Sequence, residues 1–243
     1  MSLENVVIIL AGTKHPGNIG SVARAMANMG LGRLVLAAPR CRITDESYRL
    51  AKAGGPILES ARVCRSLAGA LRGVRLLVGT TGKSGGYRSP AAPPRAIVPR
   101  ILDHAARQRV GILFGPEDTG LVDDDLRLCQ LLMRIPTHRR ASSINLAQAV
   151  MVVAYELFLG SLGHTPARAI RTASLEQTEA MYAQLEKALL EIGFLHTQNA
   201  QHMMFTLRRI FGRAGLESAD VGTLRGIARQ ISWYATTQDP AGD

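Results

Sequence analysis

Short, strongly apolar segments alternate with segments of helical apolar spacing along the first 140 residues, and this alternation constrains the fold more than any other feature. The apolar segments are rich in branched residues and mostly lack polar positions, which is typical of strands buried on both faces. Strands separated by helices pair in parallel, in sheets that helices cover. We predict strands at 6–10, 33–38, 74–79, 110–114 and 131–135. The sequence thus predicts an α/β fold, with a parallel sheet and helices on both faces.

Helices are expected between these strands and after the last of them. Apolar spacing and end-capping residues predict helices at 21–29, 45–53, 60–71 and 97–107. A longer helix is expected to start at Ser142 and Ser143, because serines before an apolar run are typical of a helix N-terminus. This helix runs to about Gly160 and should be buried, since its first three turns carry no charge. Asn145 would lie inside its first turn.

A change in composition after Gly160 divides the chain into two parts. We predict one domain over residues 1–160 and a linker over 161–174, because that stretch has glycine, proline and basic residues with little periodicity. Residues 175–243 form a small helical extension, with helices expected at 175–192, 203–214 and 223–236. The apolar run before the linker approaches membrane-spanning length, but polar residues interrupt it, so we interpret it as a core helix.

The overall charge limits the choice of partners. The 243 residues carry a formal net charge of +10, and a protein this basic often binds a polyanion, of which nucleic acid is the first candidate. The alternative is that the charge serves solubility alone. Three scattered cysteines form no Cys-x-x-Cys pair, so neither a zinc site nor a disulfide framework is indicated. The N-terminus lacks the pattern of a signal peptide. We therefore expect a cytoplasmic protein without a membrane segment or a metal.

Several predicted strands end directly in loops that bear glycine, threonine or serine. In open α/β sheets, ligands bind outside the carboxyl ends of the strands. This rule brings three segments to one edge of the sheet, namely Thr80 to Gly82, Gly115 to Glu117, and Ile135 to Asn145. The pattern alone therefore predicts a ligand site at this edge.

The first glycine-rich segment, Gly17 to Gly20, follows a strand and precedes a predicted helix, where such a turn can seat a phosphate. The dinucleotide-binding fingerprint would need glycine where His15 stands. An NAD site is therefore disfavoured, and an NADP-dependent oxidoreductase survives only weakly through Arg40. Arg24 would lie early in the helix, where a cation opposes the helix dipole, and this placement suggests a purpose other than solvation.

Two further polar residues have structural as well as functional interpretations. Glu117 follows the glycine after the fourth predicted strand, where a carboxylate can bind a cation or simply cap the next turn, and capping is the more common role. Asn145 must satisfy four hydrogen-bonding sites. Neighbouring loops usually do so, and a ligand does so less often.

Taken together, three blocks of the sequence resemble the SPOUT class of RNA methyltransferases, more narrowly its TrmH-type 2'-O-ribose branch. Their order and separation match the three motifs of that class, over the first 160 residues. The blocks are Asn18 to Met26, Leu113 to Leu121, and Ser142 to Val150.

The resemblance implies a trefoil knot at the C-terminal end of the first domain, where the third block threads a preceding loop. It implies S-adenosylmethionine bound by the knot loops, no metal, and a homodimer whose active sites combine both chains. Arg24 would be the catalytic arginine, with Glu117 and Asn145 in support. The implied cofactor contacts are Thr80, Thr81, Gly82, Gly115, Ile135, Ser142, Ser143 and Ile144.

Two C-terminal segments, Thr206 to Ala214 and Leu224 to Ile227, resemble the extension of the TrmJ-type tRNA (cytidine/uridine-2'-O-)-methyltransferases, which act on the ribose at position 32 of the anticodon loop. Basic residues in this extension are expected to bind RNA phosphates. They are Arg208, Arg209, Arg213 and Arg225. Two alternatives stay open, namely methylation of another ribose in tRNA or rRNA, and a catalytically silent RNA-binding module of the same fold.

Overall fold

The computed structural model describes residues 2–83, 90–163, 172–196 and 198–238. The chain divides into two compact units, residues 1–169 and residues 170–243. Residues 84–89 of the loop after the third predicted strand, and residues 164–171 of the predicted linker, lie outside the described residues.

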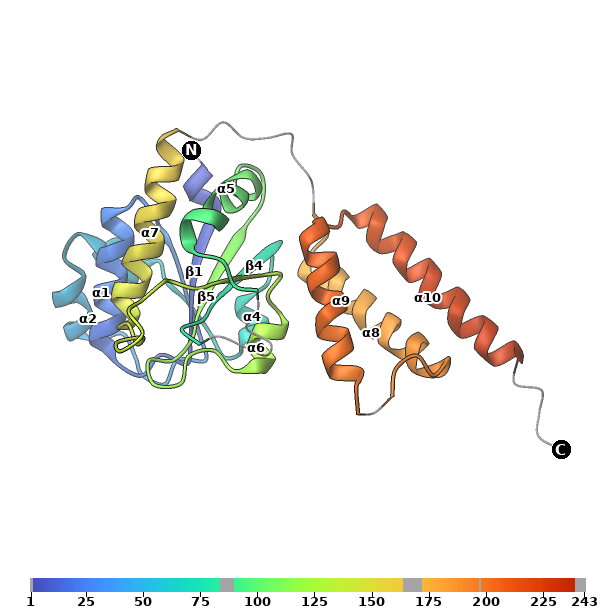
Figure 1. Cartoon of the computed structure of the whole chain (residues 1–243). Helices are drawn as coiled ribbons and strands as arrows, with labels where there is room; N and C mark the ends of the chain where they lie inside the picture. The colour runs from blue at the N-terminus through green and yellow to red at the C-terminus, as the bar shows by residue number, and fades with distance from the viewer. Residues whose placement is uncertain (1, 84–89, 164–171, 197, 239–243) are drawn as a thin grey trace. The chain divides into compact units, whose positions relative to one another are not determined.

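The first unit is built on a six-stranded parallel sheet in the order β3-β2-β1-β5-β4-β6 (Figure 1). All six residues of the central strand β1 are buried, which explains its unbroken apolar sequence. The five predicted strands are confirmed, with ends that differ from the prediction by at most two residues. The strands are β1 (Val6–Ala11), β2 (Arg33–Ala37), β3 (Arg62–Cys64), β4 (Leu76–Thr80), β5 (Val110–Phe114) and β6 (Leu131–Met133).

Helices cover both faces of this sheet, as predicted. Figure 1 shows α1, α2 and α7 along one side of the strands and α4 and α6 along the other. Helix α7 contacts both α1 and α5. The helical elements are η1 (Ser2–Asn5), α1 (Pro16–Asn28), α2 (Asp45–Ala51), η2 (Lys52–Gly54), α3 (Gly55–Glu59), α4 (Leu67–Ala70), α5 (Pro94–Ala105), α6 (Asp123–Arg127) and α7 (Leu146–Leu162).

The helix predicted at 60–71 is wrong. That stretch contains the edge strand β3, flanked by the short helices α3 and α4. Val63 and Cys64 pair with the backbone of β2 at Leu36 and Ala37. Pairing with a neighbouring strand is a tertiary contact that the local spacing of apolar residues does not reveal.

The predicted start of the long helix is also wrong by three to four residues. Asn145 is the N-cap of α7, and its side-chain Oδ1 accepts a hydrogen bond from the backbone N–H of Ala147 at 2.9 Å. Ser142 and Ser143 lie in the exposed segment before it. Asparagine is as good an N-cap as serine, so the sequence offers three candidates within four residues, Ser142, Ser143 and Asn145, and no local rule separates them.

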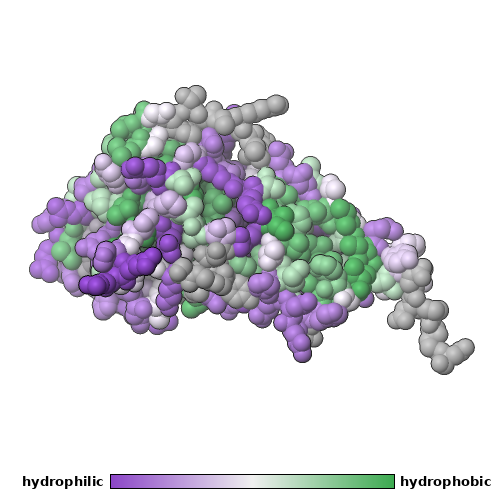
Figure 2. All heavy atoms as spheres, viewed as in Figure 1, coloured by the Kyte–Doolittle hydropathy of each residue, from purple (hydrophilic) through white to green (hydrophobic). Residues whose placement is uncertain are grey.

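Burial of α7 is confined to one face, whereas we expected the whole helix to be buried. Val150, Val153 and Leu157 on the inner face are fully buried. The outer face carries an apolar stripe at helical spacing, whose members are 38–66% exposed. This α7 stripe consists of Val152, Tyr155, Leu159 and Leu162. Figure 2 shows green, hydrophobic atoms over the end of α7 at the upper left.

The second unit consists of three helices, α8 (Leu175–Glu191), α9 (Ala200–Ala214) and α10 (Ser218–Gln238). The predicted helices are confirmed in number and order, although α9 and α10 begin three and five residues earlier than predicted. Ser174 caps α8 and forms a capping box with Gln177. A separate hydrophobic core joins the helices through Met181, Tyr182 and Met204, among others.

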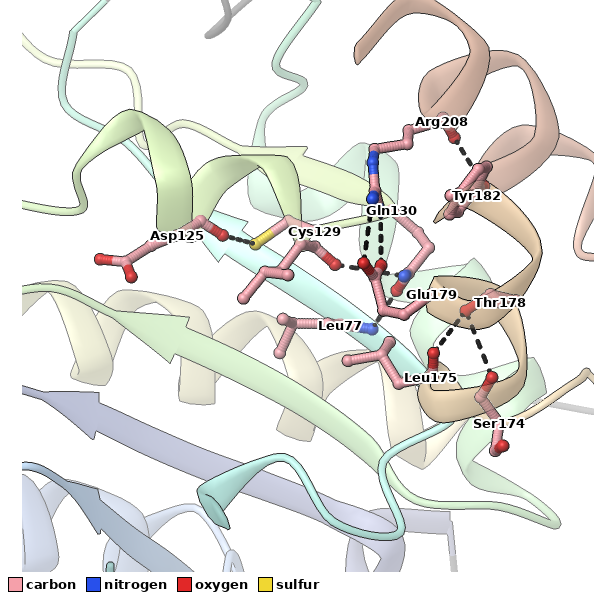
Figure 3. Close-up of polar contacts among 11 residues, drawn as sticks. Leu77, Asp125, Cys129, Gln130, Ser174, Leu175, Thr178, Glu179, Tyr182 and Arg208 are labelled. Carbon is pink, nitrogen blue, oxygen red and sulfur yellow. Dashed lines mark hydrogen bonds and ion pairs between the residues drawn. The ribbon is translucent and has the colours of Figure 1, made fainter. Parts of the chain in front are cut away.

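An ion pair between two helices braces this unit (Figure 3). Both terminal nitrogens of Arg208 on α9 donate to the Glu179 carboxylate on α8, and the Nη2–Oε2 distance is 2.9 Å. The guanidinium lies 4.3 Å from the centre of the Tyr182 ring. Burial raises the pKa of Tyr182 to about 12, so this ring keeps its hydroxyl proton. The planar fork of arginine suits a paired, stacked position of this kind.

None of the helices within the described ranges is both long and apolar enough to span a membrane. In that same part of the chain, no three His, Cys, Asp or Glu side chains are grouped so as to hold a metal ion.

Candidate active site

A pocket of about 240 Å³ lies at the carboxyl ends of β4, β5 and β6. Three loops and the start of α7 form its wall. The structure brings all eight predicted cofactor residues to this wall. They are Thr80, Thr81, Gly82, Gly115, Ile135, Ser142, Ser143 and Ile144. The edge of the sheet that the strand-end rule selects is therefore the edge where the pocket lies.

Backbone and hydroxyl hydrogen bonds hold the β4 side of the pocket in place. The Thr80 hydroxyl donates to the carbonyl of Leu113 in β5 at 2.9 Å. The backbone N–H of Thr81 donates to the carbonyl of Met133 in β6 at 2.9 Å. Since these groups are already paired, the Thr80–Gly82 turn is a fixed wall rather than a loose loop.

Gly115 is required by the shape of the second loop. A Cβ atom at this position would lie 2.3 Å from the backbone nitrogen of Leu121, closer than any non-bonded atoms approach. The loop after β5 folds back on itself here, and the N–H of Gly120 donates to the carbonyl of Pro116 at 2.9 Å. The missing side chain lets the backbone itself line the pocket.

A chain of hydrogen bonds connects the three sequence blocks. The Glu117 Oε1 atom accepts from the Asn18 side chain at 2.8 Å, and the Asn18 Oδ1 atom accepts from the Asn145 amide at 3.2 Å. Asn145 in turn caps α7. The loop after β5, the first turn of α1 and the start of α7 are thereby held together. Asn18 lies within the first block, but the sequence alone did not single it out as the link between the other two residues.

Glu117 is a carboxylate at neutral pH. Burial alone would raise its pKa, but hydrogen bonds from the Asn18 side chain and from backbone N–H groups outweigh this effect and leave the pKa below its usual value. One of these N–H groups is that of Lys14, at 3.2 Å from Oε2. A carboxylate held by several donors stays ionised and can hold neighbouring groups in place through those hydrogen bonds.

The position predicted for Arg24 is wrong. Helix α1 begins at Pro16, so Arg24 lies in its middle, about 12 Å along the axis from the first turn. The Arg24 side chain is exposed and does not line the pocket of its own chain. The argument from an unfavourable helix dipole therefore does not apply to it.

Gly17 to Gly20 are also not a phosphate-binding turn, because they belong to α1 itself. Gly20 serves packing. A Cβ atom there would lie 2.1 Å from the carbonyl oxygen of Ser47 in α2. The turn between β1 and α1 is instead residues 12–15, in which Gly12 adopts a φ of +61°.

The arginines predicted to bind RNA differ in their surroundings. Arg208 is committed to the ion pair with Glu179 inside the helical unit. The Arg225 Nε atom donates to the Gln184 side chain at 3.0 Å. Arg209 lies 5.9 Å from the centre of the Phe205 ring. The geometry thus gives Arg208 a structural role that the sequence did not suggest.

Comparison with known families now identifies the chain. The model of the SpoU rRNA methylase family matches residues 5–155, and the model of the tRNA methyltransferase TrmJ C-terminal domain matches residues 176–241. The chain belongs to the SpoU methylase family. The pair of matches, one for each compact unit, assigns it to the TrmJ type and confirms the resemblance stated from the sequence.

Relatives of the TrmJ type match almost the whole chain. The tRNA (cytidine/uridine/adenosine-2'-O-)-methyltransferase TrmJ of Pseudomonas aeruginosa is 36% identical, over 96% of this chain and 96% of its own length. The tRNA (cytidine/uridine-2'-O-)-methyltransferase TrmJ of Sodalis glossinidius is also 36% identical, over 99% and 96%. The crystal structure of TrmJ from Z. mobilis ZM4 superposes with a TM-score of 0.77 at 32% identity, covering 93% of this chain and 98% of that one.

Proposed function

We propose that the protein transfers a methyl group from S-adenosylmethionine to a ribose 2'-hydroxyl in tRNA, at the cytidine or uridine of position 32 in the anticodon loop. The observation that carries this proposal is the convergence of the three sequence blocks on one pocket at the carboxyl edge of the sheet. Membership of the SpoU family and the names of the TrmJ relatives support the reaction class. Position 32 rests on the resemblance of the extension.

The residues of the pocket fit S-adenosylmethionine. Leu146, Ile135 and Met133 supply apolar wall, while Ser142 and Ser143 add hydroxyl groups that can hydrogen-bond a nucleoside. Any side chain at Gly115 would collide with the backbone of Gly120 and Leu121, so the loop that lines the pocket requires glycine there. Bound there, S-adenosylmethionine supplies an electrophilic methyl group. The chain's task is to hold the ribose oxygen in line with that methyl and to exclude water. Correct placement of the two reacting atoms can by itself lower the activation barrier by several kcal/mol.

Arg24 acts on the RNA rather than as a base. An arginine does not lose its proton at ordinary pH, and its planar fork suits a phosphate. We assign it to hold the phosphate next to the target ribose and to stabilise negative charge on the attacking oxygen. Glu117 and Asn145 position the loops through Asn18. In the reaction the C–O bond forms as the S–C bond breaks, and the hydroxyl proton leaves to solvent.

A homodimer explains why Arg24 lies away from the pocket of its own chain. The α7 stripe is a row of exposed apolar side chains on a helix that contacts α1, and a second copy of the chain is the occupant that the family resemblance implies. In such a dimer, Arg24 of one chain serves the pocket of the other. The trefoil knot belongs to the same proposal. The closeness of Ser142 to Gly82 around one pocket supports it.

The test is complementation in mixed dimers. Arg24→Ala and Gly115→Val chains are each expected to be inactive as homodimers, the second because its side chain would collide with the backbone of the loop that lines the pocket. Co-expressed with different affinity tags, they form a mixed dimer with one complete site, namely the intact pocket of the Arg24→Ala chain with the Arg24 of its partner. We expect about half of the wild-type single-turnover rate. An inactive mixed dimer would contradict the shared site.

The competing oxidoreductase is tested by ligand stabilisation. S-adenosylhomocysteine should raise the melting temperature by mass action, and NADPH should not. Stabilisation by NADPH and none by S-adenosylhomocysteine would favour an oxidoreductase over a methyltransferase. A catalytically silent RNA-binding module would bind S-adenosylhomocysteine and tRNA but leave no methyl group on the RNA.

A further inference from the structure

The positive charge of the chain lies in the α/β unit rather than in the helical extension. Residues 1–169 hold 22 Lys and Arg against 11 Asp and Glu, whereas residues 170–243 hold 7 against 8. Attraction of a polyanion scales with the cations that its phosphates meet. An extension without net positive charge does not supply that attraction by itself, so further phosphate contacts are to be sought on the α/β unit.

A depression of about 670 Å³ lies at the amino edge of the sheet, opposite the pocket of the candidate active site. Four arginines line it, each placed there by the start of a strand. Arg33 and Arg62 are the first residues of β2 and β3. Arg109 directly precedes β5, and Arg72 lies in the turn before β4. We call this feature the amino-edge depression.

The guanidinium groups of the amino-edge depression are not neutralised by carboxylates. Arg33 donates to the backbone carbonyl of Glu4 at 2.6 Å, and Arg62 donates to two carbonyls at the end of α4. Within the described ranges, the Arg72 and Arg109 side chains make no hydrogen bond or ion pair. Glu4 is the one acid in the lining. The lining of the depression therefore carries four positive charges and one negative charge.

The floor of the depression is open where the chain turns between α1 and β2. Cβ atoms built at Gly30 and Gly32 would have no atom within 4 Å. Each arginine still has unused N–H donors, because a guanidinium carries five. Space, exposed donors and uncompensated charge together describe a site for oxyanions.

We propose that the amino-edge depression binds phosphates of the substrate RNA, remote from the ribose that is methylated. This inference rests on the proposed function. The six residues of β1 separate the two edges by about 20 Å, a distance that a folded RNA spans while its reacting ribose lies at the pocket. Arginines bind phosphate bidentately, and contacts of this kind position RNA without reading its sequence.

The experiment compares two charge reversals in the full-length protein. Arg72→Glu alters the depression. Arg107→Glu is the matched control, since Arg107 is exposed, its side chain makes no hydrogen bond or ion pair within the described ranges, and it does not line the depression. Both change the net charge by the same amount. Affinity for fluorescently labelled tRNA is measured by anisotropy over a range of salt, together with the melting temperature and S-adenosylhomocysteine binding.

We expect Arg72→Glu to lower the slope of log affinity against log salt by about one unit per lost phosphate contact, and to weaken binding about five- to eightfold per contact at 0.1 M salt. Arg107→Glu should stay within twofold of the wild type. Arg72→Lys should retain most of the binding. Melting temperature and S-adenosylhomocysteine affinity should be unchanged, because Arg72 is exposed and its side chain makes no hydrogen bond or ion pair within the described ranges.

Equal losses in Arg72→Glu and Arg107→Glu would overturn the proposal, since they would reveal only the general field of the protein. A second result would also overturn the proposal. If inorganic phosphate raises the melting temperature of the wild type but not of Arg72→Glu, while both proteins bind tRNA equally well, the depression is a site for small anions and not for RNA. Methyl transfer is measured on the same preparations. A wild type that binds tRNA but leaves it unmethylated contradicts the proposed function and not the depression.

Discussion

Removing the Asn145 side chain should lower the free energy of unfolding through two lost interactions, because this residue caps α7 and also forms a hydrogen bond with Asn18. Loss of an N-cap costs about 1 kcal/mol, and loss of the 3.2 Å hydrogen bond to Asn18 costs about another 1 kcal/mol. Asn145→Ala should therefore lower the free energy of unfolding by about 2 kcal/mol. For a unit of this size, that corresponds to a fall of about 4–8 °C in the melting temperature.

Asn145→Ser separates the two roles, because serine caps a helix but does not reach Asn18. Its cost should be about 1 kcal/mol, and a double-mutant cycle with Asn18→Ala should give a coupling energy of about 0.5–1.5 kcal/mol. The assay is thermal and urea unfolding at one protein concentration without ligand, since binding and assembly shift the midpoint. Gln148→Ala, an exposed change on the same helix, is the control.

The reasoning is refuted if Asn145→Ala melts no lower than Gln148→Ala. If the coupling energy between Asn145 and Asn18 is indistinguishable from zero, their hydrogen bond does not connect the first and third blocks. In either case the three blocks would lie near one another without supporting one another.

Four other perturbations test single parts of the account. Gly115→Ala should weaken S-adenosylhomocysteine binding more than tenfold in calorimetry, because its Cβ would collide with the backbone of Gly120 and Leu121 in the same loop. Gly32→Ala, in open space, should not weaken binding, and equal effects of the two changes would contradict the role of Gly115. The pKa of Glu117 lies below its ordinary value of 4.5, so the stability it contributes is complete above that pH and is lost as the pH falls further. Acid melting scans should accordingly show a smaller loss in Glu117→Gln than in the wild type, and parallel curves would be evidence against it. Arg208→Lys keeps the charge but loses the fork, and should lower the urea midpoint of the extension; an unchanged midpoint would mean that the fork is dispensable. Trp233 is the single tryptophan and is 59% exposed on α10, so saturating tRNA should change its fluorescence if the extension contacts RNA, and no change would argue that it does not.

The sequence predicts most of the α/β unit because its strands are buried on both faces. Strands such as β1 and β5 need long apolar runs, and such runs are visible without a structure. The edge strand β3 was missed because one of its two sides is open to solvent. Its residues 62–64 are partly or fully exposed and carry no run of the kind that buried strands need.

The sequence predicts where the candidate site lies but not how its side chains are arranged. The strand-end rule selects the carboxyl edge, and the residues expected there do line one pocket. The bridge through Asn18 depends on how α1 meets α7, which no local pattern records. Arg24 was misplaced for a similar reason, since the start of α1 at Pro16 is set by the turn before it and not by the glycines within it.

Locating the methyl group on RNA tests the central claim most directly. The purified protein is incubated with labelled S-adenosylmethionine and unmodified tRNA, and nuclease digestion with mass spectrometry then locates the product. The account predicts a 2'-O-methylated cytidine or uridine at position 32, formed by the wild type and absent with Gly115→Val. A methyl group on a base, or no methyl group on any RNA under single-turnover conditions, would contradict it.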